Sequence, residues 1–207
     1  MPPTEHRGMI VIGIKGLIRS GKTTAARYLI EHHGFVRGRF AGALKEMLRA
    51  YLAYRGCDAR TIERLVEGDL KEAPTDWLGG RTPRHAMEWI GGSGRDYMGD
   101  DFWIGTEADR LLFESPTRVV VEDVRQPNEG IWISQEGGVV VEVIRPGQQP
   151  QDHRTERAQA NVRADRCVMN YDGDLCSTYR QIDIVVRDLI AKNVGPGLPP
   201  MQIQPVR

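Results

Sequence analysis

The residues best placed to do chemistry form one glycine-rich stretch near the start of the chain. Residues 16–23, GLIRSGKT, fit the pattern GxxxxGK[ST], follow an apolar run directly and precede a helical pattern. In that setting, glycines let backbone N–H groups curl around a phosphate, and the start of the helix adds a favourable dipole. Lys22 would then bridge the β- and γ-phosphates of a nucleoside triphosphate, and the Thr23 hydroxyl would hold Mg²⁺. The stretch therefore predicts a phosphate-binding loop rather than a chance glycine-rich turn.

A second group of candidate residues follows the apolar run at residues 119–121, which ends in Glu122 and Asp123. A carboxylate at the carboxyl end of a strand is the usual group that orients Mg²⁺ and its waters, and we assign this role to Asp123. The alternative is an acid that caps the next helix. Because a helix is expected to start at Pro127, capping is a stronger alternative for Asn128 than for Asp123.

Arginines near predicted loops and element ends form a third group: Arg19, Arg84, Arg95, Arg125 and Arg145. Taken singly, each is typical of a surface ion pair that contributes little to stability. Several of them at one edge indicate a clamp for a second phosphorylated molecule, because a guanidinium binds phosphate oxygens in a bidentate fork. The sequence has no guanine-reading NKxD motif, which argues against a GTPase.

The elements that must position these residues alternate between strands and helices. Apolar runs typical of strands buried on both faces occupy residues 9–14, 118–121 and 139–144, with weaker candidates at 35–40 and 166–170. Helical patterns occupy residues 23–31, 43–55, 83–90 and 174–192. The order predicts a three-layer α/β fold with a five-stranded parallel sheet. The polar stretch 147–161 is expected to be a loop.

Length and composition limit the class of protein. The 207 residues include 28 Lys+Arg and 28 Asp+Glu, so the chain has no net charge and no basic footprint for a nucleic acid. No apolar run approaches the ~20 residues that span a bilayer. Three cysteines without a CxxC pair argue against a disulfide framework or a zinc site. We expect a cytoplasmic protein with one domain over residues 1–194 and a disordered, proline-rich tail at 195–207.

One run of residues is more specific than the phosphate-binding loop. Residues 122–129, EDVRQPNE, precede a helical segment, a Gly-Gly pair, a strand and the tripeptide RPG at 145–147. This arrangement resembles the phage-type deoxynucleoside monophosphate kinases. Further matches in the same order extend the resemblance over about residues 9–190, at 16–24, 40–45, 84–103 and 170–175.

The resemblance implies an adenylate-kinase-like fold with a short lid at about residues 145–163. It also implies Mg²⁺-dependent transfer of the γ-phosphoryl group of ATP to a deoxynucleoside 5′-monophosphate. The residues that it implies around ATP are Gly16, Ser20, Gly21, Lys22, Thr23, Thr24, Arg145, Asn170 and Gly173. Those implied around the acceptor are Arg19, Lys45, Arg84, Arg95, Trp103, Asp123, Arg125 and Glu129. Those implied in catalysis are Lys22, Arg125, Asp123 and Arg19, with Thr23 and Asp123 on the metal.

Several alternatives stay open at this point. Trp103 is either a core residue, as its apolar helical stripe favours, or a residue that flanks the nucleotide. The acceptor could instead be that of a dephospho-coenzyme A or shikimate-type kinase, and a regulatory ATPase with a protein or DNA partner is a third candidate. The expected partners are small nucleotides, without nucleic acid or membrane. The base, the sugar and the presence of a homodimer are undecided.

Overall fold

The computed structural model describes residues 9–149 and 159–193. At its centre lies one parallel sheet in the order β2-β3-β1-β4-β5. Its strands are β1 (Ile10–Lys15), β2 (Val36–Gly38), β3 (Arg118–Val121), β4 (Val139–Ile144) and β5 (Arg166–Met169). Because every pair is parallel, all five strands end at the same edge of the sheet. The predicted five-stranded parallel sheet is confirmed, although the strand expected at 35–40 is only three residues long.

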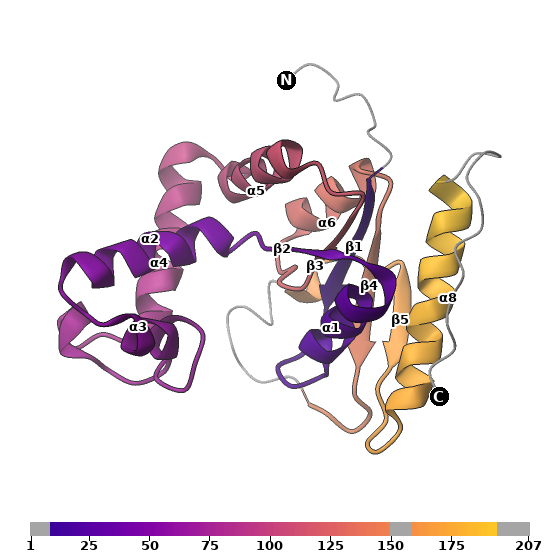
Figure 1. Ribbon diagram of the computed structural model, residues 1–207, viewed down its shortest axis with the longest axis horizontal. Helices are drawn as coiled ribbons and strands as arrows, with labels where there is room; N and C mark the ends of the chain where they lie inside the picture. Colours follow the sequence, from indigo (N-terminus) through magenta and orange to yellow (C-terminus); the bar gives the residue numbers. More distant parts are fainter. Residues whose placement is uncertain (1–8, 150–158, 194–207) are drawn as a thin grey trace.

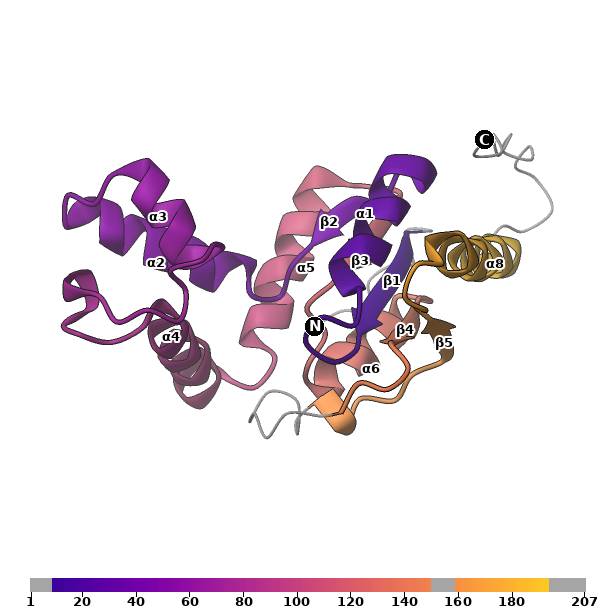
Figure 2. The ribbon, with the colours of Figure 1, turned by 90° about the horizontal axis from the view of Figure 1, so that it is seen from below.

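Helices cover both faces of this sheet (Figure 1, Figure 2). On one face pack α1 (Lys22–His33) and α8 (Leu175–Asn193), and on the other α5 (Phe102–Glu114) and α6 (Pro127–Gln135). The side chains of β1 alternate between the two layers: Ile12 and Ile14 join the first hydrophobic cluster, and Val11 joins the second. A strand covered on both faces has no polar side, which explains its unbroken apolar sequence.

A helical part stands beside the sheet rather than over either face (Figure 1). It consists of α2 (Gly42–Tyr54), α3 (Ala59–Val66), the short 3-10 helix η1 (Asp76–Leu78) and α4 (Pro83–Met98). Buried side chains from these helices and from α5 form a hydrophobic cluster of their own, which includes Leu44, Leu48, Leu52, Ile62, Leu65, Val66, Met87 and Trp103. This part meets the carboxyl edge of the sheet, where its side chains and those of the segments after β2 and β3 line a cavity.

Helix α4 is longer than its sequence pattern predicts. It begins at Thr82 and Pro83 as expected, with Thr82 as the N-cap. It does not end at residue 90, however, and runs through the sequence GGSG to Met98. A Cβ on Gly94 would lie 2.5 Å from Cζ2 of Trp103, so α4 and α5 pack too closely for a side chain at this position. Gly94 lowers the intrinsic helix propensity of this segment, but the packing of α4 against α5 requires it.

Some expectations fall outside the described residues. The lid expected at about 145–163 and the polar loop expected at 147–161 both include residues 150–158, and the tail expected at 195–207 lies beyond residue 193. No helix within the ranges 9–149 and 159–193 combines the length and the apolar character needed to cross a membrane.

Candidate active site

The loop between β1 and α1 has a backbone that requires glycine at two positions. Gly16 and Gly21 have φ angles of 142° and 106°, which L side chains rarely adopt. A Cβ on Gly16 would lie 2.4 Å from the carbonyl oxygen of Val143. A Cβ on Gly21 would lie 2.3 Å from Nδ2 of Asn170. Both glycines of the GxxxxGK[ST] pattern therefore follow from the geometry of this loop and its neighbours.

The side chain of Lys22 folds back over this loop. Its Nζ donates hydrogen bonds to the carbonyl oxygens of Gly16 at 2.6 Å and Leu17 at 2.7 Å. The hydroxyl of Ser20 is buried in the same loop and has no hydrogen-bond partner within the described part of the chain. Charged phosphate oxygens are stronger acceptors than carbonyl oxygens, so a phosphate entering the loop would compete for the ammonium of Lys22.

A first cavity, of about 410 Å³, opens beside this loop. Its lining comes from the segments that follow β1, β4 and β5: Arg19, Gly21, Lys22, Thr23, Thr24, Arg145, Asn170, Tyr171, Asp172, Gly173 and Leu175. Asn170 Nδ2 donates to the carbonyl oxygen of Ser20 at 2.8 Å, and Arg145 forms an ion pair with Asp172. Arg145 also donates to the carbonyl oxygen of Arg19 at 3.4 Å. The structure thus brings together the residues expected around ATP, with Gly16 and Ser20 in the loop itself.

A second cavity, of about 160 Å³, lies between the helical part and the segments that follow β2 and β3. Residues expected around the acceptor line it: Lys45, Arg84, Arg95, Trp103, Asp123, Arg125 and Glu129. Apolar side chains of Phe40, Leu44 and Met87 complete much of the wall. Arg19 differs from the other expected acceptor residues, because it follows β1 and lines the first cavity.

The sheet order explains why the two cavities are neighbours. Strands β1 and β3 are adjacent and parallel, with Gly13 aligned with Val121. The phosphate-binding loop after β1 and the segment of Asp123 after β3 therefore leave the sheet side by side, at its carboxyl edge. From β1 the chain continues to β2 on one side of the sheet, and from β3 it crosses β1 to reach β4 on the other side. The direction of the connections therefore changes next to β1. Open α/β sheets bind ligands at such a switch point.

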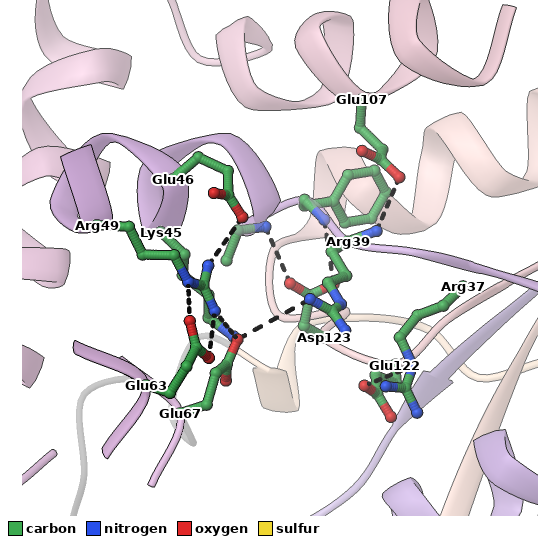
Figure 3. A network of polar contacts seen from close by, with 12 residues as sticks. Arg37, Arg39, Lys45, Glu46, Arg49, Glu63, Glu67, Glu107, Glu122 and Asp123 are labelled. Atoms are coloured by element: carbon green, nitrogen blue, oxygen red, sulfur yellow. Dashed lines mark hydrogen bonds and ion pairs between the residues drawn. The ribbon is translucent and has the colours of Figure 1, made fainter. Parts of the chain in front are cut away.

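Asp123 joins the end of β3 to the start of α2. One carboxylate oxygen accepts the N–H of Phe40 at 3.2 Å, and the other accepts the N–H of Ala41 at 2.9 Å (Figure 3). Ala41 is the N-cap residue of α2 and has no side-chain acceptor of its own. Asp123 thus acts as a capping acid, on α2 rather than on the next helix along the chain, while it also lines the second cavity.

Glu129 is a buried carboxylate in the first turn of α6. It accepts the N–H of Arg125 at 2.6 Å and that of Gln126 at 2.9 Å, in a capping box with Gln126. Burial raises the pKa of Glu129 to about 7, and the charge of Asp123 adds to this, against the lowering effect of the two N–H groups and the Arg125 charge. Glu129 holds the backbone that carries the Arg125 side chain to the second cavity.

Lys45 is held by a carboxylate at the end of α3. Its Nζ lies 3.0 and 2.9 Å from the two oxygens of Glu67, which is also 3.9 Å from Arg39 and 3.5 Å from Arg49 (Figure 3). Burial raises the pKa of Glu67, but the hydrogen bond and charge of Lys45, followed by the charges of Lys71 and Arg39, lower it overall. Glu67 therefore stays ionised and neutralises part of the positive charge at the second cavity.

The sequence patterns missed two charged residues of this region, Glu67 and Lys71. Lys71 lines the second cavity together with Lys45. Both missed residues belong to the segment 57–80, for which the resemblance supplied no match. The feature of the sequence that could have pointed to them is the charged run EGDLKE at 67–72. Trp103 is buried and donates its Nε1–H to the carbonyl oxygen of Gly91 at 2.9 Å, so it belongs to the core and also to the cavity wall.

Together, the parallel sheet, the glycine-requiring loop after its central strand and the two adjoining cavities define a P-loop protein of the three-layer α/β class. Over 190 residues, the chain is 30% identical to a protein of Acanthamoeba polyphaga mimivirus named "Putative deoxynucleotide monophosphate kinase", with 84% of this chain and 94% of that protein covered. The chain belongs to the deoxynucleotide monophosphate kinase family.

The crystal structure of TT1252 from Thermus thermophilus resembles the chain with a TM-score of 0.47 and 22% identity, over 87% of this chain and 98% of that one. A likeness at this level carries no argument about function. No protein-family model matches the chain.

Proposed function

We propose that this chain transfers the γ-phosphoryl group of ATP, bound in the first cavity, to a deoxynucleoside 5′-monophosphate bound in the second. The observation that carries the proposal is the pairing of the cavities. One is built on the phosphate-binding loop, and the other, on the neighbouring segments after β2 and β3, is lined by Lys45, Arg84 and Arg125. Two cavities lined by cationic side chains at one sheet edge suit two phosphorylated molecules better than a single nucleotide with water.

The first cavity suits the triphosphate of ATP. Lys22 would exchange its contacts with loop carbonyls for the β- and γ-phosphates, and Asn170 and Gly173 would lie beside the adenine. The Thr23 hydroxyl and the Asp123 carboxylate would hold Mg²⁺, which neutralises phosphate charge when bound. This oxygen donor set fits the ion, because Mg²⁺ takes most of its ligands from phosphates and water and needs few from the protein. Among the described residues there is no group of three or more His, Cys, Asp or Glu side chains suited to a metal.

The second cavity suits a nucleoside monophosphate, whose base has flat aromatic faces. Its cations lie toward α2, α4 and the segment after β3, and its apolar wall is formed by Leu44, Met87 and Trp103. A base buried against such a wall is recognised by shape and by a few polar groups at its edge. The Arg84 and Arg125 side chains would bind the acceptor phosphate, with Arg95 deeper along α4 toward the nucleoside.

In this mechanism, the protein aligns two reactants and neutralises charge. The acceptor phosphate is already anionic near neutral pH, because its second pKa is about 6, so no strong general base is required. An acceptor oxygen attacks the γ-phosphorus, the bond to the β–γ bridging oxygen breaks, and ADP leaves. Lys22, Arg19 and Arg125 would stabilise the charge that spreads over the transferred group.

An acceptor panel in a coupled ADP-release assay tests the proposal. The purified full chain is given ATP and Mg²⁺ with each of dAMP, dCMP, dGMP and dTMP, their ribose counterparts, dephospho-coenzyme A or shikimate, and once with no acceptor. We expect turnover with at least one deoxynucleoside monophosphate, well above the rate without an acceptor. Turnover with dephospho-coenzyme A or shikimate alone would identify a different small-molecule kinase. Equal turnover with and without every acceptor would identify an ATPase.

A further inference from the structure

Lys71 lines the second cavity from a segment that none of the motifs includes. It lies between α3 and α4, and its backbone is tied on both sides. Its N–H donates to the carbonyl oxygen of Gly68 at 3.4 Å, and its carbonyl oxygen accepts the N–H of Arg84 at 3.1 Å. The second bond satisfies a free N–H in the first turn of α4. The start of α4 therefore positions Lys71 as well as Arg84 at the cavity.

The ammonium of Lys71 has no hydrogen-bond or ion-pair partner within residues 9–149 and 159–193, whereas its cationic neighbours are partly engaged. Lys45 is paired with Glu67, and Arg84 is paired with Glu72. A partly buried cation with no counter-ion in contact indicates a site for an external anion.

The charges that face Lys71 come from four elements or segments. Lys45 on α2, Arg84 on α4 and Arg125 after β3 repel it, and Glu67 at the end of α3 attracts it. Burial, followed by the charges of Lys45 and Arg84, lowers the pKa of Lys71 to about 8, although Glu67 opposes this. Glu67, which pairs with Lys45, and Glu72, which pairs with Arg84, thus balance only part of the positive charge of this cluster, and a dianion would balance more.

We propose that the ammonium of Lys71 binds the phosphate group of the acceptor monophosphate, together with Arg84 and Arg125. This inference rests on the proposed function. The phosphate offers three acceptor oxygens and nearly two negative charges near neutral pH. It would relieve the repulsion within the cluster and favour the protonated form of Lys71. Binding of the acceptor above pH 8 would therefore be accompanied by uptake of a proton by Lys71.

The test compares Lys71→Met and Lys71→Arg with the wild-type chain, using the deoxynucleoside monophosphate that is turned over fastest in the acceptor panel. Loss of a hydrogen bond to a charged group is expected to raise KM for the monophosphate about 10- to 100-fold in Lys71→Met, with KM for ATP changed less than about twofold. Lys71→Arg should keep most of the affinity. Arg60→Met, which removes a positive charge from the exposed face of α3, is the matched control and should change neither constant.

A pH profile separates phosphate binding from a structural role. In the wild-type chain, KM for the monophosphate should rise above about pH 8 as Lys71 loses its proton. In Lys71→Arg this rise should be absent, because a guanidinium stays charged over the whole range. The profile of Lys71→Arg also tests the proposal if Lys71→Met fails to fold.

Three results would overturn the role of Lys71: an unchanged KM for the monophosphate in Lys71→Met, an equal rise of both KM values, or the same alkaline rise in Lys71→Arg as in the wild type. Each leaves the kinase activity itself in place. By contrast, a wild-type chain that turns over none of the monophosphates would refute the proposed function, so the two failures are distinguishable.

Discussion

The carboxylate of Asp123 and the N–H of Ala41 form a hydrogen bond of 2.9 Å between residues 82 positions apart in the chain. With the second bond, to Phe40 at 3.2 Å, it fastens the start of α2 to the end of β3. This connection sets the helical part against the carboxyl edge of the sheet. Asp123, which the sequence offered as a magnesium ligand, is therefore one of the groups that set the position of α2, and with it Lys45, relative to the sheet.

Removal of the Asp123 carboxylate should affect stability as well as turnover. In Asp123→Ala, two N–H groups lose their acceptor, so we expect the free energy of unfolding to fall by about 1–3 kcal/mol. Asp123→Asn keeps one acceptor oxygen and should lose less. Urea denaturation followed by circular dichroism measures both, with Asp109→Asn on the exposed side of α5 as the control. A wild-type urea midpoint for Asp123→Ala would contradict the structural role.

Lys22→Ala should reduce turnover by orders of magnitude and leave the fold intact. The reason is that the side chain bonds to carbonyls of its own loop in the free protein, whereas it would meet phosphate charge in the transition state. Steady-state kinetics and the melting temperature are measured together. Arg27→Ala, an exposed cation on the same helix, is the control. Retention of more than about a tenth of the wild-type turnover would argue against the phosphate-binding role of the loop.

Arg125→Ala should impair use of the acceptor more than use of ATP. The Arg125 side chain lines the second cavity, and its backbone is fixed by Glu129. Loss of a charged hydrogen bond predicts a rise of about tenfold or more in KM for the monophosphate. The KM for ATP should stay within about twofold of its wild-type value, and Arg180→Ala on the exposed side of α8 should change neither constant. Equal effects on both substrates would remove Arg125 from the acceptor site.

Glu129→Gln should change how stability depends on pH. The pKa of Glu129 is raised from 4.5 to about 7 by burial, so between these values the folded state binds a proton that the unfolded state has lost. The contribution of Glu129 to the free energy of unfolding therefore falls as pH rises from about 4.5 to about 7, by an amount on the order of 3 kcal/mol. The amide of the variant cannot ionise, and its oxygen can still accept an N–H.

Thermal melts of the wild type and Glu129→Gln between pH 5 and pH 8 check this prediction. Relative to the wild type, the variant should gain stability steadily as pH rises, with no further gain above about pH 8. Glu136→Gln, a partly exposed acid just beyond α6, serves as the control. If the difference in melting temperature between the wild type and Glu129→Gln stayed the same from pH 5 to pH 8, Glu129 would already be ionised in the folded protein at acid pH.

Local patterns were sufficient for some elements and misleading for others. The strands β1, β3 and β4 were predictable because β-branched, apolar runs buried on both faces allow few other structures. The end of α4 was not predictable from its glycines, because the position of Gly94 against the Trp103 indole is decided by a second helix. Capping of α2 by Asp123 was not predictable either, since the N–H groups that it accepts belong to a segment far away in the sequence.

The phosphate-binding loop is encoded locally: one short run of residues, between a strand and a helix, contains the glycines, the lysine and the hydroxyl that its geometry needs. The second cavity is different in kind. Lys45, Lys71, Arg84 and Arg125 line one cavity only because the helical part packs against the segment that follows β3 at the carboxyl edge of the sheet. Like charges so far apart in sequence carry no local signal of their meeting, because packing of the apolar side chains brings them together against their mutual repulsion.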